Sequence, residues 1–225
     1  MRLRRVARTN PELEVVSLPS RAELFRRLPR LLAGIVVLGP GIALTLRARL
    51  GVSPWDVLHQ GLARKTGFSF GVVVVLVGVV VLLVWIPIRQ RFGVGTVINT
   101  LTVGFLVDLA LDVLPRPDAL AARWALLLGG IVVVALGMGL YISAGLGPGP
   151  RDGLMTGIAA KGYSIWAVRT VLELSALVIG WTLGGNVGVG TVIFAFGIGP
   201  LGHLFLSVFH LGPAPADMGP GIAAE

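Results

Sequence analysis

The sequence predicts an all-α membrane protein, a polytopic membrane helix bundle of two repeats. Three observations predict it: the apolar composition, long apolar segments, and a block of sequence that occurs twice. Of the 225 residues, 55% are hydrophobic and only 13% are charged, whereas a soluble domain carries about 25% charged residues. Apolar stretches near or above about 18 residues recur, and each is long enough for a helix to cross a bilayer.

The duplicated block indicates the architecture. Residues 41–65 and 137–161 align at an offset of 96 and share glycines, a Pro-x-Asp pattern and a terminal lysine. The hexapeptide GVGTVI then occurs at 93–98 and again at 188–193, an offset of 95. Chance does not readily produce an exact six-residue repeat in the same order. We therefore expect each half of the chain to form the same structural unit.

Each repeat is predicted to contain three long helices and one short helix. The membrane domain spans 31–210, with repeat one at 31–115 and repeat two at 122–210. The long helices are expected at 31–50, 70–88, 96–114, 123–146, 165–183 and 191–209. The segment 1–30 is expected to be a basic cytoplasmic tail with an interfacial helix near 21–30, and 211–225 a disordered tail.

A short helix is predicted after the first long helix of each repeat. Pro54 and Pro150 suit the first helical position. Ser53 is a good N-cap and Asp56, three residues on, completes a capping box, whereas Gly149 is a weaker cap. About a dozen residues span about 18 Å, too little for about 30 Å of hydrocarbon. Re-entrant, interfacial and spanning placements remain open.

Helix parity and charge bear on topology. Three spanning helices per repeat is an odd number, which predicts an inverted-topology repeat, whereas spanning short helices make the repeat parallel. Eight arginines lie within the first 30 residues, which favours a cytoplasmic N-terminus. In that arrangement one group of basic residues falls on the outside, against the rule: Arg47, Arg49, Arg64, Lys65, Arg116 and Arg123.

The candidate binding residues start with the aligned carboxylates Asp56 and Asp152. Paired acids near a pseudo-twofold axis can bind a cation or carry protons, and capping acids that satisfy a helix start are the alternative. Arg151, which aligns with Trp55, can assist anion binding at a helix start or act as a positive-inside flank. This mismatch makes any substrate site asymmetric.

Two further candidates are Arg169 and Glu173, four residues apart on one helix face. They can line a polar cavity or form a self-neutralising structural pair; Val74 and Gly78 occupy the aligned positions. Asp108 aligns with His203, and hydrogen bonding is a more ordinary role for them than metal binding. With no cysteine and no catalytic motif, we expect no metal, no cofactor and no enzymatic activity. The net charge of +8 comes without a basic face, so we expect no nucleic-acid partner.

At SPWDVLHQGLA, RQRFGVGTVIN and GLYISAGLGPGPRDGLMTG the chain resembles the YczE-like bacterial integral membrane proteins, related to the YitT-type family. The resemblance covers roughly 31–210 and implies a bacterial cytoplasmic (inner) membrane protein in contact with the lipid bilayer. It supplies no set of catalytic residues. We predict a small transporter or permease for an unknown small molecule or ion, with its site between the repeats. A non-transporting accessory or scaffold protein is the alternative, and self-association is left open.

Overall fold

The protein is an all-helical bundle in which six helices are long and apolar enough to cross a membrane by length and composition. The computed structural model describes residues 21–209, and the predicted tails at 1–20 and 211–225 lie outside them. In chain order the helices are α1 (Arg21–Ala48), α2 (Pro54–Thr66), α3 (Phe70–Ile88), α4 (Val94–Val113), α5 (Leu120–Ser143), α6 (Pro150–Ala159), α7 (Ile165–Thr182) and α8 (Val189–Phe209). The described part of the chain contains no strand.

The predicted helices are confirmed in number and order, with one correction at the start of α1. The expected interfacial helix near 21–30 is not separate, because α1 runs without a break from Arg21 to Ala48. Pro29 lies inside it and removes one backbone donor. Arginine, leucine and alanine on both sides are strong helix formers, so the helix continues. Part of the predicted tail is therefore the first turns of α1.

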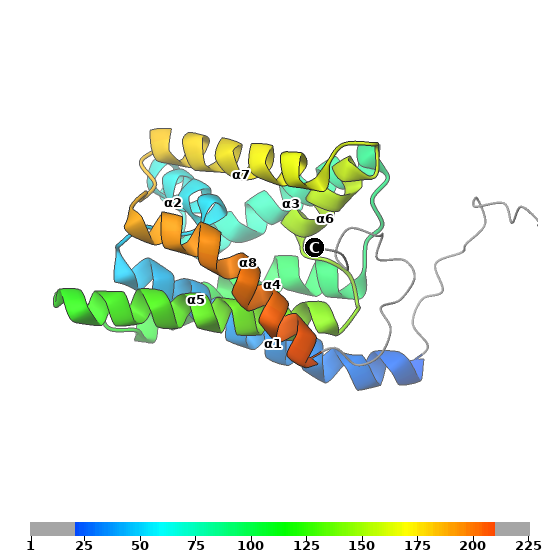
Figure 1. Cartoon of the computed structure of the whole chain (residues 1–225), viewed down its shortest axis with the longest axis horizontal. Coiled ribbons are helices and arrows are strands. Elements are labelled where there is room, and N and C mark those ends of the chain that lie inside the picture. The colour runs from blue at the N-terminus through cyan, green and yellow to red at the C-terminus, as the bar shows by residue number, and fades with distance from the viewer. Residues whose placement is uncertain (1–20, 210–225) are drawn as a thin grey trace, which may run out of the picture.

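Helix contacts divide the described residues into two groups of four. In the first group α5 packs along both α1 and α8, and α1 also packs along α4. In the second group α2 packs along α7 and α3 along α6, with smaller contacts between α6 and α7 and between α2 and α3. Figure 1 shows α7 lying over α2, α3 and α6, apart from α1, α4, α5 and α8. We call these the α1–α4–α5–α8 group and the α2–α3–α6–α7 group. The most extensive helix contact between the groups is α3 with α4, and Val57 of α2 also packs in the core with residues of α1 and α4.

Glycines bring the two central helices, α1 and α5, into close contact. A Cβ at Gly34 would lie 2.5 Å from the backbone nitrogen of Tyr141, and one at Gly137 would lie 2.7 Å from that of Leu38. Helices in lipid gain little from apolar burial against each other, so close backbone packing at small residues holds them together. The α1–α5 pair is therefore the most closely packed helix pair of its group.

The two GVGTVI segments begin α4 and α8 and join the linkers of opposite halves. Thr96 Oγ1 accepts the N–H of Gly93 at 3.3 Å, and Thr191 Oγ1 accepts that of Gly188 at 3.3 Å. The N–H of Gly95 donates to Leu146 O at 2.7 Å, and the aligned Gly190 N–H donates to Leu50 O, also at 2.7 Å. These segments therefore start a helix and allow close packing against the opposite half.

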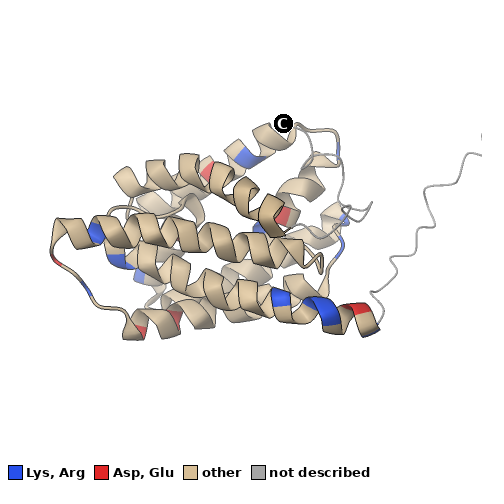
Figure 2. Ribbon diagram, turned by 60° about the horizontal axis from the view of Figure 1, so that its bottom comes forward, with Lys and Arg blue, Asp and Glu red and all other residues tan. Residues whose placement is uncertain are grey.

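Charged residues gather mostly toward the two ends of the helices, and the middle of the bundle is largely uncharged (Figure 2). This distribution is the one expected of helices that cross hydrocarbon, where a charge at mid-depth costs several kcal/mol, roughly 3 on insertion scales. Charged residues that lie away from the ends of the bundle are therefore candidates for a functional site.

Candidate functional site

A cavity of about 120 Å³ lies between the two helix groups. Its walls are the inner faces of α1, α3, α4, α5 and α8 together with the first turns of both short helices, α2 and α6. The walls are mostly apolar, and polar groups enter at the starts of α2 and α6 and from α4 and α5. Cavities of about 150 Å³ hold a benzene-sized molecule. This one is the right size for a small solute or a few waters.

The start of α2 brings a buried carboxylate into the cavity wall. Asp56 is 7% exposed, and its Oδ2 accepts the hydroxyl of Ser53 at 2.6 Å. Ser53 Oγ in turn accepts the backbone N–H of Asp56 at 3.2 Å, which confirms the predicted N-cap. The predicted capping box is only half formed, because the carboxylate takes the serine hydroxyl rather than the Ser53 N–H. His59 Nδ1 lies 3.4 Å from Asp56 Oδ1.

This Ser53–Asp56–His59 arrangement differs from a hydrolase triad. In a triad the histidine lies between the nucleophile and the acid, where it removes the serine proton. Here the carboxylate lies in the middle and holds the serine hydroxyl itself. The arrangement can keep a buried acid satisfied and can exchange a proton between Asp56 and His59, which suits binding or relay chemistry.

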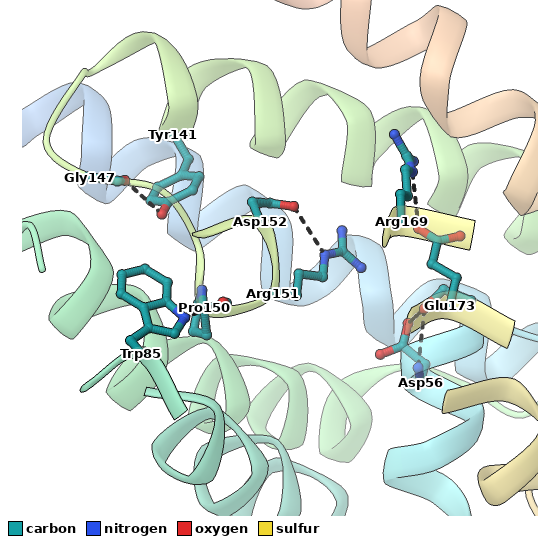
Figure 3. Close-up of polar contacts among 10 residues, drawn as sticks. Asp56, Trp85, Tyr141, Gly147, Pro150, Arg151, Asp152, Arg169 and Glu173 are labelled. Carbon is teal, nitrogen blue, oxygen red and sulfur yellow. Dashed lines mark hydrogen bonds and ion pairs between the residues drawn. The ribbon is translucent and has the colours of Figure 1, made fainter. Parts of the chain in front are cut away.

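The start of α6 lacks a side-chain cap and is more open. Gly149 provides no capping hydrogen bond, and the Asp152 carboxylate lies 3.7 Å from Arg151 Nε, with each side chain about a third exposed, 37% and 34%. Trp85 Nε1 donates to Pro150 O at 3.0 Å. In Figure 3 the Arg151 side chain extends away from Trp85, toward the side on which Asp56 lies. The aligned acids therefore share a cavity but have different partners.

The same cavity wall contains polar groups that the sequence analysis did not assign. Tyr141 is 2% exposed and its hydroxyl donates to Gly147 O at 2.9 Å, which ties α5 to the linker that leads into α6. Asn99 and Thr100 of α4 contribute further polar atoms. Nothing local marks Tyr141 in the sequence. His59 could have been found from the sequence, because it follows Asp56 by three residues and that spacing puts both side chains on one helix face.

The predicted pair on α7 forms but stands apart from the cavity. Arg169 Nε lies 3.2 Å from Glu173 Oε1, and neither residue lines the cavity. Their place in a substrate site stays a prediction. Asp108 has an identifiable structural role, since it accepts the Ser69 hydroxyl at 2.5 Å and the Gly71 N–H at 2.8 Å. No group of three or more His, Asp or Glu residues within 21–209 could hold a metal ion.

Comparisons with known proteins agree with the predicted resemblance. The chain matches the family of unknown function DUF6198 over residues 25–207. It is 40% identical over 185 residues to an uncharacterized protein of Haemophilus influenzae, covering 82% of this chain and 85% of that one. The uncharacterized membrane protein YczE of Bacillus subtilis is 33% identical over 178 residues, covering 78% of this chain and 83% of its own. YyaS, an uncharacterized protein of the same organism, is 30% identical over 180 residues, covering 78% and 90%.

No solved structure matches the chain. The alignments with these relatives cover most of each relative and most of this chain. The family match spans nearly the whole described bundle. The predicted resemblance to YczE-like proteins is therefore confirmed, and the chain is a multi-pass helical membrane protein that belongs to the DUF6198 family.

Proposed function

We propose that this protein is a small transporter of the bacterial cytoplasmic membrane, with its N-terminus in the cytoplasm. The observation that carries the proposal is the cavity, because the first turns of both short helices, Trp55–Asp56 and Gly149–Asp152, contribute to one space. Interrupted helices whose starts meet inside a bundle are the usual setting of a transport site. The position of Asp56 between Ser53 and His59 also fits a role in transport rather than in catalysis.

An inverted pair of repeats is part of the proposal. Each half has three candidate spans and one short helix of 13 or 10 residues. The matched hydrogen bonds of Gly95 and Gly190 support it, because aligned residues reach across to the opposite half at the same distance. In such an arrangement the substrate lies at the interface of the halves, and alternating access comes from rigid-body motion around it.

The helix contacts support a specific pair of moving bodies. Each four-helix group takes two helices from each half, and the most extensive helix contact between the groups is that of α3 with α4. We therefore propose that the α2–α3–α6–α7 group rocks against the α1–α4–α5–α8 group about the α3–α4 contact. The cavity lies between the groups, so this rocking changes access to Asp56 and Asp152.

The chemistry of the walls limits the solute to a small molecule or ion with a charged group. Two carboxylates, Asp56 and Asp152, one guanidinium, Arg151, and the imidazole of His59 line walls that are mostly apolar. A cation, a proton or the amine of a small organic solute matches the excess of acid. The partly exposed Arg151–Asp152 pair is the more accessible of the two helix starts for first contact with the solute.

Proteoliposomes made with the purified chain test the proposal. The uptake screen uses protons, sodium and potassium, then small amines and amino acids, with Asp56→Asn, Asp152→Asn and Asp118→Asn as variants. Asp118 is the matched control, because its side chain is fully exposed, pairs with Arg49 and does not line the cavity. We expect uptake to fall at least tenfold in the first two variants and to stay within twofold in the control. Unchanged uptake in both cavity variants would remove the carboxylates from the mechanism.

The alternative role, an accessory protein that binds a membrane partner, has one observation in its favour. On α8 the face formed by Ala195, Gly199 and His203 is exposed, and a Cβ at Gly199 would meet no atom within 4 Å. A partner helix can use such a small-residue face. In this alternative the unaltered chain shows no uptake and Gly199→Leu abolishes partner binding. In a transporter that does not use this face, Gly199→Leu leaves uptake unchanged.

A further inference from the structure

A second pocket, of about 330 Å³, lies where α1 and α4 end, away from the cavity between the groups. Four arginines line it, Arg47, Arg49, Arg64 and Arg116, together with Gln60, and no carboxylate does. Four guanidinium groups around one space repel one another unless something negative balances them. The protein itself satisfies only some of these groups.

Three of the four arginines donate to backbone carbonyl groups. Arg47 donates to Leu111 O near the end of α4, Arg64 to Gly184 O just after α7, and Arg49 to Pro117 O at 2.9 Å. The C-terminal ends of helices attract cations, so these bonds have an ordinary structural explanation. They use few of the available donors, because each guanidinium carries five N–H groups.

Several donors in and beside this pocket remain without a protein acceptor. Arg47 Nε is buried and has none, and no hydrogen bond to protein is found for Arg116 among the described residues. Gln60 Oε1 accepts the N–H of Asn186 at 2.9 Å, which leaves the amide N–H groups of Gln60 free to donate. An unpaired buried donor costs about 1–3 kcal/mol, more if charged. These groups together have no acceptor among the described residues.

The acidic residues nearby balance only part of the charge. Asp118 pairs with Arg49 at 3.1 Å, and Asp112 lies close enough to Arg47 to attract it. Arg64 and Arg116 have no carboxylate partner among the described ion pairs. These arginines also belong to the basic residues that fall on the outside in the six-span topology, against the positive-inside rule. A bound anion explains both observations.

We propose that this arginine pocket binds a phosphate-type oxyanion, either a soluble phosphate or the headgroup of an anionic phospholipid. Planar guanidinium groups match phosphate oxygens with paired hydrogen bonds, and basic pockets between transmembrane helices bind anionic headgroups. The pocket shares no lining residue with the proposed transport cavity, so the two sites are separate. Its test is independent of any transported solute.

Thermal unfolding of the purified chain, followed by tryptophan fluorescence, tests the pocket. The first arm uses nanodiscs of phosphatidylcholine with inorganic phosphate or chloride at equal ionic strength. The second arm replaces part of the phosphatidylcholine with phosphatidylglycerol and omits phosphate. Arg64→Gln, Arg116→Gln and the double variant remove the pocket charges. Lys65→Gln is the matched control, because it removes the same charge from the same end of α2 without lining the pocket.

We expect phosphate or phosphatidylglycerol to raise the Tm by several degrees in at least one arm. Arg116→Gln and Arg64→Gln should each lose at least two thirds of that rise, and Lys65→Gln should lose little of it. A rise with inorganic phosphate identifies a soluble anion, and a rise only with phosphatidylglycerol identifies a lipid headgroup. No rise in either arm would overturn the proposal. An equal loss in Lys65→Gln would also overturn it, since the effect would then come from general surface charge.

Discussion

The second and third long helices of the two halves, α3 with α4 and α7 with α8, are aligned in sequence but pack differently. α3 packs closely on α4, whereas α7 makes almost no contact with α8. On α4 the face made of Thr100, Gly104 and Asp108 meets α3, and a Cβ at Gly104 would collide with the carbonyl group of Gly71. The same face on α8, made of Ala195, Gly199 and His203, is exposed.

The difference comes from α7 rather than from α8. Gly104 and Gly199 are both glycines, but Gly71 aligns with Trp166, which is 74% exposed. Gly78, whose Cβ would lie 2.8 Å from Thr100 Cγ2, aligns with Glu173. Small residues on both partners are needed before helix backbones can touch. The α3–α4 contact is therefore closely packed and forms the proposed hinge, whereas α7 and α8 stay apart.

Chemical crosslinking gives the largest expected contrast between the two contacts. The chain contains no native cysteine, so Ser69→Cys with Asp108→Cys and the aligned Ser164→Cys with His203→Cys can be compared directly. Ser69 and Asp108 are hydrogen-bonded at 2.5 Å, so a short bifunctional thiol reagent should link that pair almost completely. The second pair should link only slightly at rest, and more when a transported solute moves the groups. Equal crosslinking of both pairs at rest would contradict the comparison.

Alanine at the two aligned glycines should differ in its effect on stability. Gly104→Ala forces the backbones of α3 and α4 apart, and we expect it to lower the free energy of unfolding by about 3 kcal/mol, the upper part of the range for overpacking. Gly199→Ala meets open space and removes a poor helix former, so it should be neutral or stabilising by up to about 1 kcal/mol. Denaturant unfolding in detergent measures both. Similar losses in the two variants would show that α8 is packed after all.

The aligned polar positions should differ by less. Asp108→Ala removes the acceptor of the Ser69 hydroxyl and the Gly71 N–H, which should cost about 1–3 kcal/mol of unfolding free energy. His203 is exposed, and His203→Ala should change stability by no more than about 0.5 kcal/mol. The same unfolding assay compares them. A loss in His203→Ala as large as that in Asp108→Ala would place a contact on α8 that the comparison denies.

The smallest effect is expected for the ion pair on the open side. Arg169 and Glu173 are 50% and 24% exposed at their side chains, so a double-mutant cycle with Arg169→Gln and Glu173→Gln should give a coupling of about 0.3–1 kcal/mol. The double variant should then unfold with less loss than the two single losses added together. Additive losses would mean that the two groups act separately.

Much of the local structure could be predicted from the sequence. The boundaries of α3 match the prediction residue for residue, and the starts of α2 and α6 at Pro54 and Pro150 were both foreseen. These features depend on hydropathy and on capping bonds between near neighbours, such as Ser53 with Asp56. The continuation of α1 through Pro29 was missed because the charge of that segment, not its helix propensity, guided the prediction.

The candidate site was only partly predictable. Asp56, Arg151 and Asp152 were chosen from the aligned helix starts, and all three line the cavity. Arg169 and Glu173 were predicted instead from their spacing of four residues on one helix face, and they do not line the cavity. Spacing along one helix shows that two side chains can pair, but it does not show which side of the bundle they face. His59, Tyr141 and the arginine pocket depend on neighbours that no local pattern specifies.

The sequence by itself determined that the chain is a membrane helix bundle and where its two short helices begin, and it predicts that its halves are related, because hydropathy, capping and duplication are properties of short segments. The tertiary structure decided that helices from both halves mix in two groups, that α3 packs on α4 while α7 stays off α8, and that four arginines meet in one pocket. These outcomes rest on contacts between residues far apart in the chain, such as Gly71 with Gly104 or Arg64 with Gly184. A single bulky side chain at one partner is enough to prevent such a contact.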